Sequence, residues 1–252
     1  MSKPRVVIVT GGGSGMGRAI AHRFANAGDK VYILGRRLEK LNDTAKGFPG
    51  IECLVTDVTD TLLIEKARDT IIKNHKSVDV LVNNAGGNIK VDPNATLKQA
   101  NAAWNQIVES NLTSVFNMIF AFDKYLIRPG GRIINISSIA ALGGSRQGGV
   151  SGQAYSAAKS GIHGLTRTLV SGFAKDKITI NSVAPGVIGD TEFFAGKPMP
   201  EELVKFYLPK IPLNELGKPD DIAAGVFYLA SDDARYITGE IVNINGGLQF
   251  GR

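Results

Sequence analysis

The sequence predicts a single doubly wound α/β domain, in which a parallel sheet of about seven strands is covered by helices on both faces. Short runs rich in β-branched residues recur along the 252-residue chain, and most are apolar throughout, which suits strands that are buried on both faces. Helical stretches separate most of these runs, and such alternation implies right-handed crossovers between parallel strands. Because no linker, charge block or repeat interrupts the pattern, we expect one domain over residues 1–252.

The expected elements follow one another in chain order. Strands are expected at Val6–Thr10, Val31–Leu34, Ile51–Thr56, Val78–Val82, Arg132–Ile136, Thr179–Ala184 and Ile241–Ile244. Helices are expected near Met16–Ala27, Glu39–Lys46, Thr61–Asn74, Asn101–Leu126, Ala154–Lys175 and Asp220–Ala230. Two irregular stretches remain, at 143–152 and 186–212, and loops of that length usually form lids or substrate-binding segments.

Composition excludes several classes of protein. The 30 glycines show no three-residue period, which excludes a collagen-like chain. The single Cys53 excludes an internal disulfide framework, and His22, His75 and His163 have no paired spacing, so we expect no metal site. Neither a signal segment nor an apolar stretch of membrane-spanning length is present, and a reducing, cytoplasmic location without membrane contact is the simplest expectation.

The net charge of +6 raises the question of a nucleic-acid partner. Basic side chains are spread along the chain, with 16 before residue 127 and 13 after it, and they form no stripe. We therefore expect no nucleic acid as a partner, and only Arg36-Arg37 has the character of a local anion site.

A glycine cluster lies between the first expected strand and the first expected helix. It runs Thr10-Gly11-Gly12-Gly13-Ser14-Gly15-Met16-Gly17. Glycines there let backbone N–H groups approach a pyrophosphate at a helix N-terminus, where the helix dipole also favours negative charge. Placed in this context, the cluster predicts a dinucleotide site.

The second expected strand ends at Arg36-Arg37, with no acidic residue before Glu39. An acid at this place binds the ribose hydroxyls of NAD(H), whereas arginine accommodates the 2′-phosphate of NADP(H). NADP(H) is therefore the preferred cofactor and NAD(H) the alternative. Asp57, after the third strand, either accepts a hydrogen bond from adenine or caps the turn that follows.

A second group of residues has catalytic character. Tyr155 and Lys159 are four residues apart on one helix face, so the ammonium can lower the pKa of the phenol and prepare it for proton transfer. Ser138 closes the fifth strand, where open sheets bind ligands, and is preferred over Ser137 because side chains alternate along a strand. Asn111 lies inside an expected helix, which calls for a reason such as a bound water or a freed carbonyl.

Together these motifs resemble the short-chain dehydrogenase/reductase family, with its Rossmann fold, over essentially the full chain. The resemblance is carried by Thr10-Gly11-x-x-x-Gly15-x-Gly17, Asn83-Asn84-Ala85-Gly86, Asn111, Ser138, Tyr155-x-x-x-Lys159, Asn181 and Pro185-Gly186. It implies that Tyr155 is the general acid/base, Lys159 lowers the pKa of Tyr155 and holds the nicotinamide ribose, Ser138 orients the substrate oxygen, and Asn111 anchors a water of a proton relay. The cofactor contacts that it implies are Gly11, Gly13, Ser14, Gly15, Met16, Gly17, Asp57, Val58, Asn84, Ala85, Gly86, Pro185, Gly186, Ile188 and Thr191.

The resemblance implies an enzyme that moves hydride between NADP(H) and a carbonyl/secondary-alcohol pair. A 3-oxoacyl thioester reductase is the first expectation, a sugar, polyol or xenobiotic ketone reductase the second, and a catalytically idle NADP(H)-binding sensor the third. The family also implies a homotetramer or dimer. Two departures bear on the substrate side: Ser138 and Tyr155 are 17 residues apart, more than is usual, and Thr191 comes one residue late after Pro185-Gly186.

Overall fold

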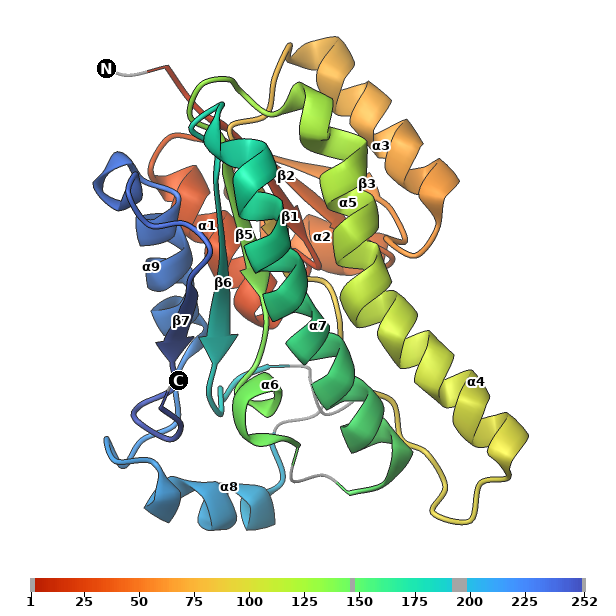
Figure 1. Ribbon diagram of the computed structural model, residues 1–252. Helices are drawn as coiled ribbons and strands as arrows, with labels where there is room; N and C mark the ends of the chain where they lie inside the picture. The colour runs from red at the N-terminus through yellow and green to blue at the C-terminus, as the bar shows by residue number, and fades with distance from the viewer. Residues whose placement is uncertain (1–2, 146–147, 192–198, 251–252) are drawn as a thin grey trace.

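The computed structural model describes residues 3–145, 148–191 and 199–250, and the chain builds one seven-stranded sheet (Figure 1). The strands are β1 (Val6–Thr10), β2 (Lys30–Gly35), β3 (Ile51–Val55), β4 (Val80–Asn83), β5 (Arg132–Ile136), β6 (Thr179–Pro185) and β7 (Ile241–Ile244). They pair in the order β3-β2-β1-β4-β5-β6-β7, and every pairing is parallel. The predicted doubly wound parallel sheet is confirmed.

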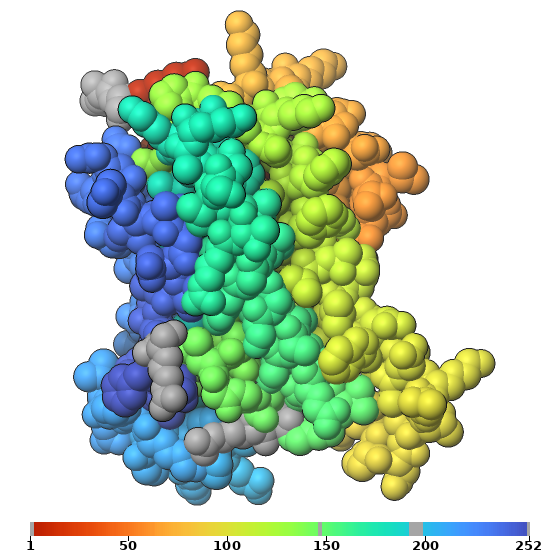
Figure 2. Space-filling model, in the orientation of Figure 1, coloured from red at the N-terminus to blue at the C-terminus, as the bar shows by residue number. Residues whose placement is uncertain are grey.

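Helices cover both faces of the sheet. The longer ones are α1 (Gly15–Asn26), α2 (Leu38–Ala45), α3 (Thr61–Asn74), α4 (Leu97–Val108), α5 (Ser114–Phe122), α7 (Gly149–Ala174) and α9 (Pro219–Leu229). Buried side chains of α1, α2 and α9 pack on one face, and those of α3, α5 and α7 pack on the other. The space-filling view shows α7 next to α4 and α5 on one side of the molecule (Figure 2).

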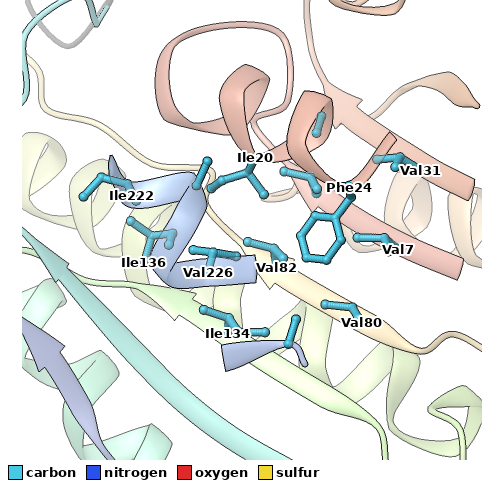
Figure 3. Packing of buried hydrophobic residues seen from close by; sticks show 14 of the residues in the cluster. Val7, Ile20, Phe24, Val31, Val80, Val82, Ile134, Ile136, Ile222 and Val226 are labelled. Atoms are coloured by element: carbon cyan, nitrogen blue, oxygen red, sulfur yellow. The ribbon is translucent and has the colours of Figure 1, made fainter. Parts of the chain in front are cut away.

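The two-sided core explains why the strands are apolar without alternation. Along β1, Val7 and Val9 face α1 and α9, while Val6 and Ile8 face the α3–α5–α7 layer. Figure 3 shows the first layer, where Phe24 of α1 lies among valines and isoleucines of the strands. Each strand therefore needs apolar side chains at both odd and even positions.

The strand order reverses between β1 and β4, which leads the chain to opposite sides of the sheet. In open α/β sheets, this reversal leaves a crevice beyond the carboxyl ends of the strands. The segments that follow β1, β2, β4, β5 and β6 all lie at this edge and line one cleft. The functional residues predicted from sequence are concentrated in these segments.

The helix predicted at 101–126 is wrong in its details. α4 ends at Val108, a π-helical turn follows at Glu109–Thr113, α5 ends at Phe122, and a 3-10 turn completes the segment at Asp123–Tyr125. The fourth strand also starts later than predicted, because Val78 forms only an isolated bridge to Leu126. In the π-turn the backbone takes up one extra residue, which hydrophobic periodicity does not reveal.

The two stretches predicted as loops are partly helical. α6 (Ala140–Gly143) ends at the first residue of 143–152, the first turn of α7 forms the end of that stretch, and α8 (Glu201–Tyr207) lies within 186–212. Glycine is unfavourable in helices, yet Gly152 is buried at the start of α7, so packing outweighs propensity there. Residues 146–147 and 192–198 lie outside the described part. Within the described ranges, no helix combines the length and the apolarity needed to cross a membrane.

Candidate active site

The turn from β1 to α1 is built for a close approach of backbone to a ligand. A Cβ atom at Gly17 would collide with the Gly11 carbonyl oxygen and would lie 2.5 Å from Asn84 Nδ2, so only glycine fits there. The Thr10 hydroxyl accepts hydrogen bonds from the backbone N–H groups of Asn84 and Ala85, both at 2.9 Å. These contacts lock the glycine turn against the segment after β4.

Asn84 lines the cleft and also contacts the glycine turn. Its Nδ2 donates to the carbonyl oxygens of Thr10 at 2.9 Å and Gly11 at 3.3 Å. The Asn84 side chain therefore helps to hold the glycine turn in its conformation.

Gly86 brings the same segment against two predicted catalytic residues. It has a φ of +153°, and a Cβ atom there would lie 2.5 Å from Asn111 Oδ1 and 3.4 Å from Lys159 Nζ. A side chain at this position would both strain the backbone and displace these groups. Glycine at this position therefore leaves room for the side chains of Asn111 and Lys159.

Asn111 is fully buried inside the π-turn, and the structure supplies the reason for a polar residue there. Its Nδ2 donates to the carbonyl oxygens of Ile107 and Gly87, both at 2.8 Å, and its Oδ1 accepts from the Gly87 N–H at 3.0 Å. The bond to Ile107 serves a carbonyl four residues earlier, as the sequence reasoning anticipated. The amide therefore ties the π-turn to the β4 segment.

Lys159 lies beneath the cleft and is only 4% exposed. Its Nζ donates to the Ile136 carbonyl oxygen at 2.9 Å and lies 5.7 Å from the centre of the Tyr155 ring. Burial lowers the pKa of Lys159 to about 8, because the ammonium loses hydration. The ammonium and the phenol share one face of α7, as their spacing predicts.

Tyr155 is hydrogen-bonded to Ser138, and burial raises its pKa to about 12. This direction is opposite to the one expected from the nearby ammonium. Removing water disfavours the phenolate more than the bond from Ser138 favours it. The surrounding protein groups therefore keep the phenol of Tyr155 in its protonated form.

The two serines that follow β5 point to different partners. Ser138 meets Tyr155 and accepts a hydrogen bond from the Ala140 N–H at 3.1 Å. The Ser137 hydroxyl faces α7 and lies 2.6 Å from His163 Nε2. Of the two hydroxyls, the one at Ser138 is thus placed beside the phenol.

Cations collect where β2 ends. Arg36, Arg37 and Lys40 line the cleft there, and Arg36 Nη1 lies 3.9 Å from Asp57 Oδ2. Asp57 Oδ1 accepts bonds from the backbone N–H and the hydroxyl of Thr59, at 3.0 and 2.8 Å. The turn-capping role left open by the sequence is therefore present, and the second carboxylate oxygen faces Arg36.

All these segments border one cleft of about 840 Å³, a size within the usual range of ligand sites. Two of the predicted site residues, Asn111 and Lys159, lie behind its wall. The others line it: Gly11, Gly13, Ser14, Gly15, Met16, Gly17, Arg36, Arg37, Asp57, Val58, Asn84, Ala85, Gly86, Ser138, Tyr155, Pro185, Gly186, Ile188 and Thr191. The structure thus gathers at one place residues that are distant in sequence.

The sequence predicts a substrate-binding segment at 186–212 but does not identify the apolar side chains that line the cleft. These side chains come from the β4 segment, the approach to α8, α8 itself and the C-terminal segment: Ile89, Met199, Leu203, Phe206, Tyr207 and Leu248. Leu203 and Phe206 are three residues apart on one helix face, a signal that was available in the sequence. The position of Leu248 depends on tertiary packing alone.

Local hydrogen bonds and one unusual backbone conformation accommodate the two departures from the family pattern. Between Ser138 and Tyr155, the Ser145 N–H donates to Ser156 Oγ at 2.7 Å, and Ser160 Oγ donates to the Ala141 carbonyl at 3.1 Å. Asp190 takes a φ of +52°, which aspartate tolerates better than most residues, and a Cβ at Gly15 would lie 3.5 Å from Thr191 Cβ. Thr191 therefore reaches the glycine turn despite the extra residue.

The cleft offers both side-chain and backbone groups to a ligand. Across the ranges that the structure describes, no group of three histidine, cysteine, aspartate or glutamate residues could hold a metal ion. A phenol and a serine hydroxyl can hold one oxygen atom of a ligand, and the neighbouring glycine turn offers backbone N–H groups and space for a pyrophosphate. The arrangement suits proton transfer beside a dinucleotide.

Comparisons with known proteins agree with this geometry. A family model described as enoyl-(acyl carrier protein) reductase matches residues 11–249. The 3-oxoacyl-[acyl-carrier-protein] reductase FabG of Thermotoga maritima is 34% identical over 251 residues, which is 97% of each chain. The acetoacetyl-CoA reductase of Shinella zoogloeoides is 38% identical over 250 residues and covers 98% of this chain and 99% of that protein. The crystal structure of a short chain dehydrogenase from Bacillus anthracis has a TM-score of 0.84 and 33% identity, with 98% of both chains covered.

Proposed function

The chain belongs to the short-chain dehydrogenase/reductase family of oxidoreductases, and from that premise we propose that it uses NADPH to reduce the 3-oxo group of an acyl thioester. The observation that carries the proposal is the contact between Ser138 and Tyr155 in a cleft that the glycine turn also lines. The relatives named for 3-oxoacyl and acetoacetyl thioesters support the choice of substrate.

In the proposed reaction, the glycine turn and the segment after β4 hold the dinucleotide, and the nicotinamide supplies the hydride when bound. Tyr155, with a pKa near 12, is protonated at neutral pH and donates its proton to the substrate carbonyl oxygen. The Ser138 hydroxyl holds the same oxygen. The carbonyl π bond is thereby replaced by a C–H and an O–H bond, and the phenol is restored by a proton that enters from solvent.

The character of the cleft supports a neutral acyl substrate. Among the lining residues that the structure describes, the charged ones are Arg36, Arg37, Lys40 and Asp57, all at the β2–β3 end. The rest of the described lining is neutral, and Met199, Leu203 and Phe206 supply apolar surface to it. Such a lining favours an acyl chain over a phosphorylated sugar.

The preference for NADPH over NADH rests on the cations at the end of β2. Arg36 is 78% exposed in its side chain, so its guanidinium can turn toward a 2′-phosphate and bind it with charge-assisted hydrogen bonds. No acidic residue is placed to bind the ribose hydroxyls at this strand end, since Glu39 is already inside α2.

We also propose a homotetramer or dimer that forms through α5 and α7, in a cytoplasmic enzyme whose free Cys53 stays reduced. Phe116 and Phe120 of α5 stack at 5.8 Å and are 49% and 76% exposed. Phe116 also borders a groove that is lined by Leu112, Gly161 and Leu165. A symmetric partner can place its own phenylalanine in this groove, which is how a two-fold interface buries one patch on both chains.

The proposal is tested with purified protein and a substrate panel: acetoacetyl-CoA, a 3-oxoacyl carrier protein, simple ketones and a ketose, each with NADPH and with NADH. We expect thioesters with NADPH to give the highest kcat/KM. Tyr155→Phe should lose at least about 100-fold in kcat while it still binds NADPH, and the exposed Tyr236→Phe should match the wild type. Faster turnover of ketones or sugars would refute the substrate, and NADPH binding without turnover of any compound would indicate a binding-only protein.

A further inference from the structure

The last two residues of β5 and the residue after the strand are tied to α7 by hydrogen bonds from side chains. Lys159, His163 and Thr166 occupy positions i, i+4 and i+7 of α7 and share one face. Thr166 Oγ1 accepts from Asn135 Nδ2 at 3.0 Å, Lys159 Nζ donates to the Ile136 carbonyl at 2.9 Å, and His163 Nε2 lies 2.6 Å from Ser137 Oγ. The next residue of the chain is Ser138.

The contact between His163 and Ser137 is buried and involves a neutral imidazole. Their exposed fractions are 7% and 3%. Burial, with the positive charges of Arg167 and Lys159, lowers the pKa of His163 to about 4. His163 lies outside the wall of the cleft and stays uncharged at neutral pH, so direct proton transfer to substrate does not explain its burial.

The same serine also touches the backbone of Lys159. Ser137 Oγ lies 3.3 Å from the Lys159 carbonyl oxygen. Both bonds form at once when His163 Nε2–H donates to the serine oxygen and the serine hydroxyl donates to that carbonyl. This chain of bonds joins the residue before Ser138 to the residue that carries the catalytic ammonium.

We propose that His163 is a positioning residue, which acts through Ser137 to hold the end of β5, with Ser138, in register with Tyr155 and Lys159 on α7. This inference rests on the proposed function, because it assigns His163 a part in arranging those groups for reduction. Loss of the bond would let Ser138 shift relative to Tyr155, and small misplacements of reacting groups are costly in rate.

The test compares His163→Leu, which removes the bond, with His163→Gln, whose amide can reach the same hydroxyl. Ser137→Ala removes the other partner with little change in volume. We expect kcat to fall about 10- to 100-fold in His163→Leu and in Ser137→Ala, with KM for NADPH within about threefold of the wild type. His163→Gln should recover kcat to within about fivefold of the wild type, and the double variant should be no slower than the slower single variant.

His75→Leu is the matched control, since His75 Nε2 bonds the Tyr32 hydroxyl at 2.9 Å on another part of the protein. It should lower the melting temperature and leave kcat unchanged. The pH profile of kcat should be the same in the wild type and His163→Gln between pH 5 and 8. A wild-type ionisation near 6.5 that disappears in His163→Gln would overturn the inference, since the imidazole would then titrate during catalysis.

Folded His163→Leu with kcat within twofold of the wild type would also overturn the inference, and so would a Gln variant no faster than the Leu variant. If His163→Leu does not fold, Ser137→Ala decides by the same criterion. Tyr155→Phe is assayed in parallel. If Tyr155→Phe retains full turnover, the proposed function fails. If Tyr155→Phe is inactive while His163→Leu and Ser137→Ala have the kcat of the wild type, only the positioning role of His163 fails.

Discussion

Replacement of Asn111 by leucine tests how far one buried amide supports the site. Leucine has nearly the same shape, so the main loss is of hydrogen bonds: two donated by Nδ2 to Ile107 and Gly87, and one accepted by Oδ1 from Gly87. Each is worth about 1–1.5 kcal/mol, toward the upper end here because Asn111 is fully buried. The free energy of unfolding should therefore fall by about 3–5 kcal/mol.

The assay is thermal and urea unfolding of the wild type and Asn111→Leu, with Asn105→Leu as the control. Asn105 lies on α4 in solvent, and its Nδ2 bonds only Asn101 Oδ1, at 3.2 Å, among the hydrogen bonds described for it. For a chain of this size, the expected loss corresponds to a fall of roughly 6–20 °C in Tm, whereas Asn105→Leu should change stability by less than about 0.5 kcal/mol. If both variants lose the same small amount, the amide does not support the π-turn as argued.

Three further predictions concern the cofactor, the charge of Lys159 and the assembly. Arg36→Ala should raise KM for NADPH at least about tenfold and leave KM for NADH nearly unchanged, since a charge-assisted bond to phosphate contributes about 1.5–3 kcal/mol; equal effects on both cofactors would contradict the phosphate-binding role. The rate of reduction should be level at neutral pH and fall above about pH 8, because Lys159 loses its charge there while Tyr155 stays protonated. If the rate does not change up to pH 10, the reaction does not need the ammonium of Lys159. The wild type should sediment as a dimer or tetramer and Phe120→Glu as a smaller species; a monomeric wild type would exclude the proposed interface.

Much of the fold can be predicted from the sequence because the strands are rich in β-branched residues and are easily recognised. β1, β5 and β7 have the bounds that were predicted, since continuous β-branched runs between polar turns leave little choice. Helix ends were harder. α7 begins five residues before the predicted start, through glycines that propensity disfavours, because Gly152 and Ala154 are buried and α7 packs against α6, which only the folded chain provides.

The site was predictable where its chemistry is local. The spacing of Tyr155 and Lys159 fixes their common face, and strand ends place Ser138 and the glycine turn at one edge of the sheet. The apolar lining of the cleft was not predictable in the same way. Met199 and Leu248 reach the cleft from segments whose path depends on how α8 and the C-terminal segment pack, and no short-range pattern encodes that path.

The pKa directions of Tyr155 and Lys159 give the most instructive difference between spacing and structure. The four-residue spacing of Tyr155 and Lys159 indicates that an ammonium lies near a phenol. From this spacing alone, one expects a lowered pKa for the phenol. Burial acts on both groups at once and favours their neutral forms, raising the pKa of Tyr155 to about 12 and lowering that of Lys159 to about 8. At neutral pH the result is a protonated phenol beside a charged ammonium. That combination has a proton ready for a carbonyl oxygen, which is what the reduction of a carbonyl group requires.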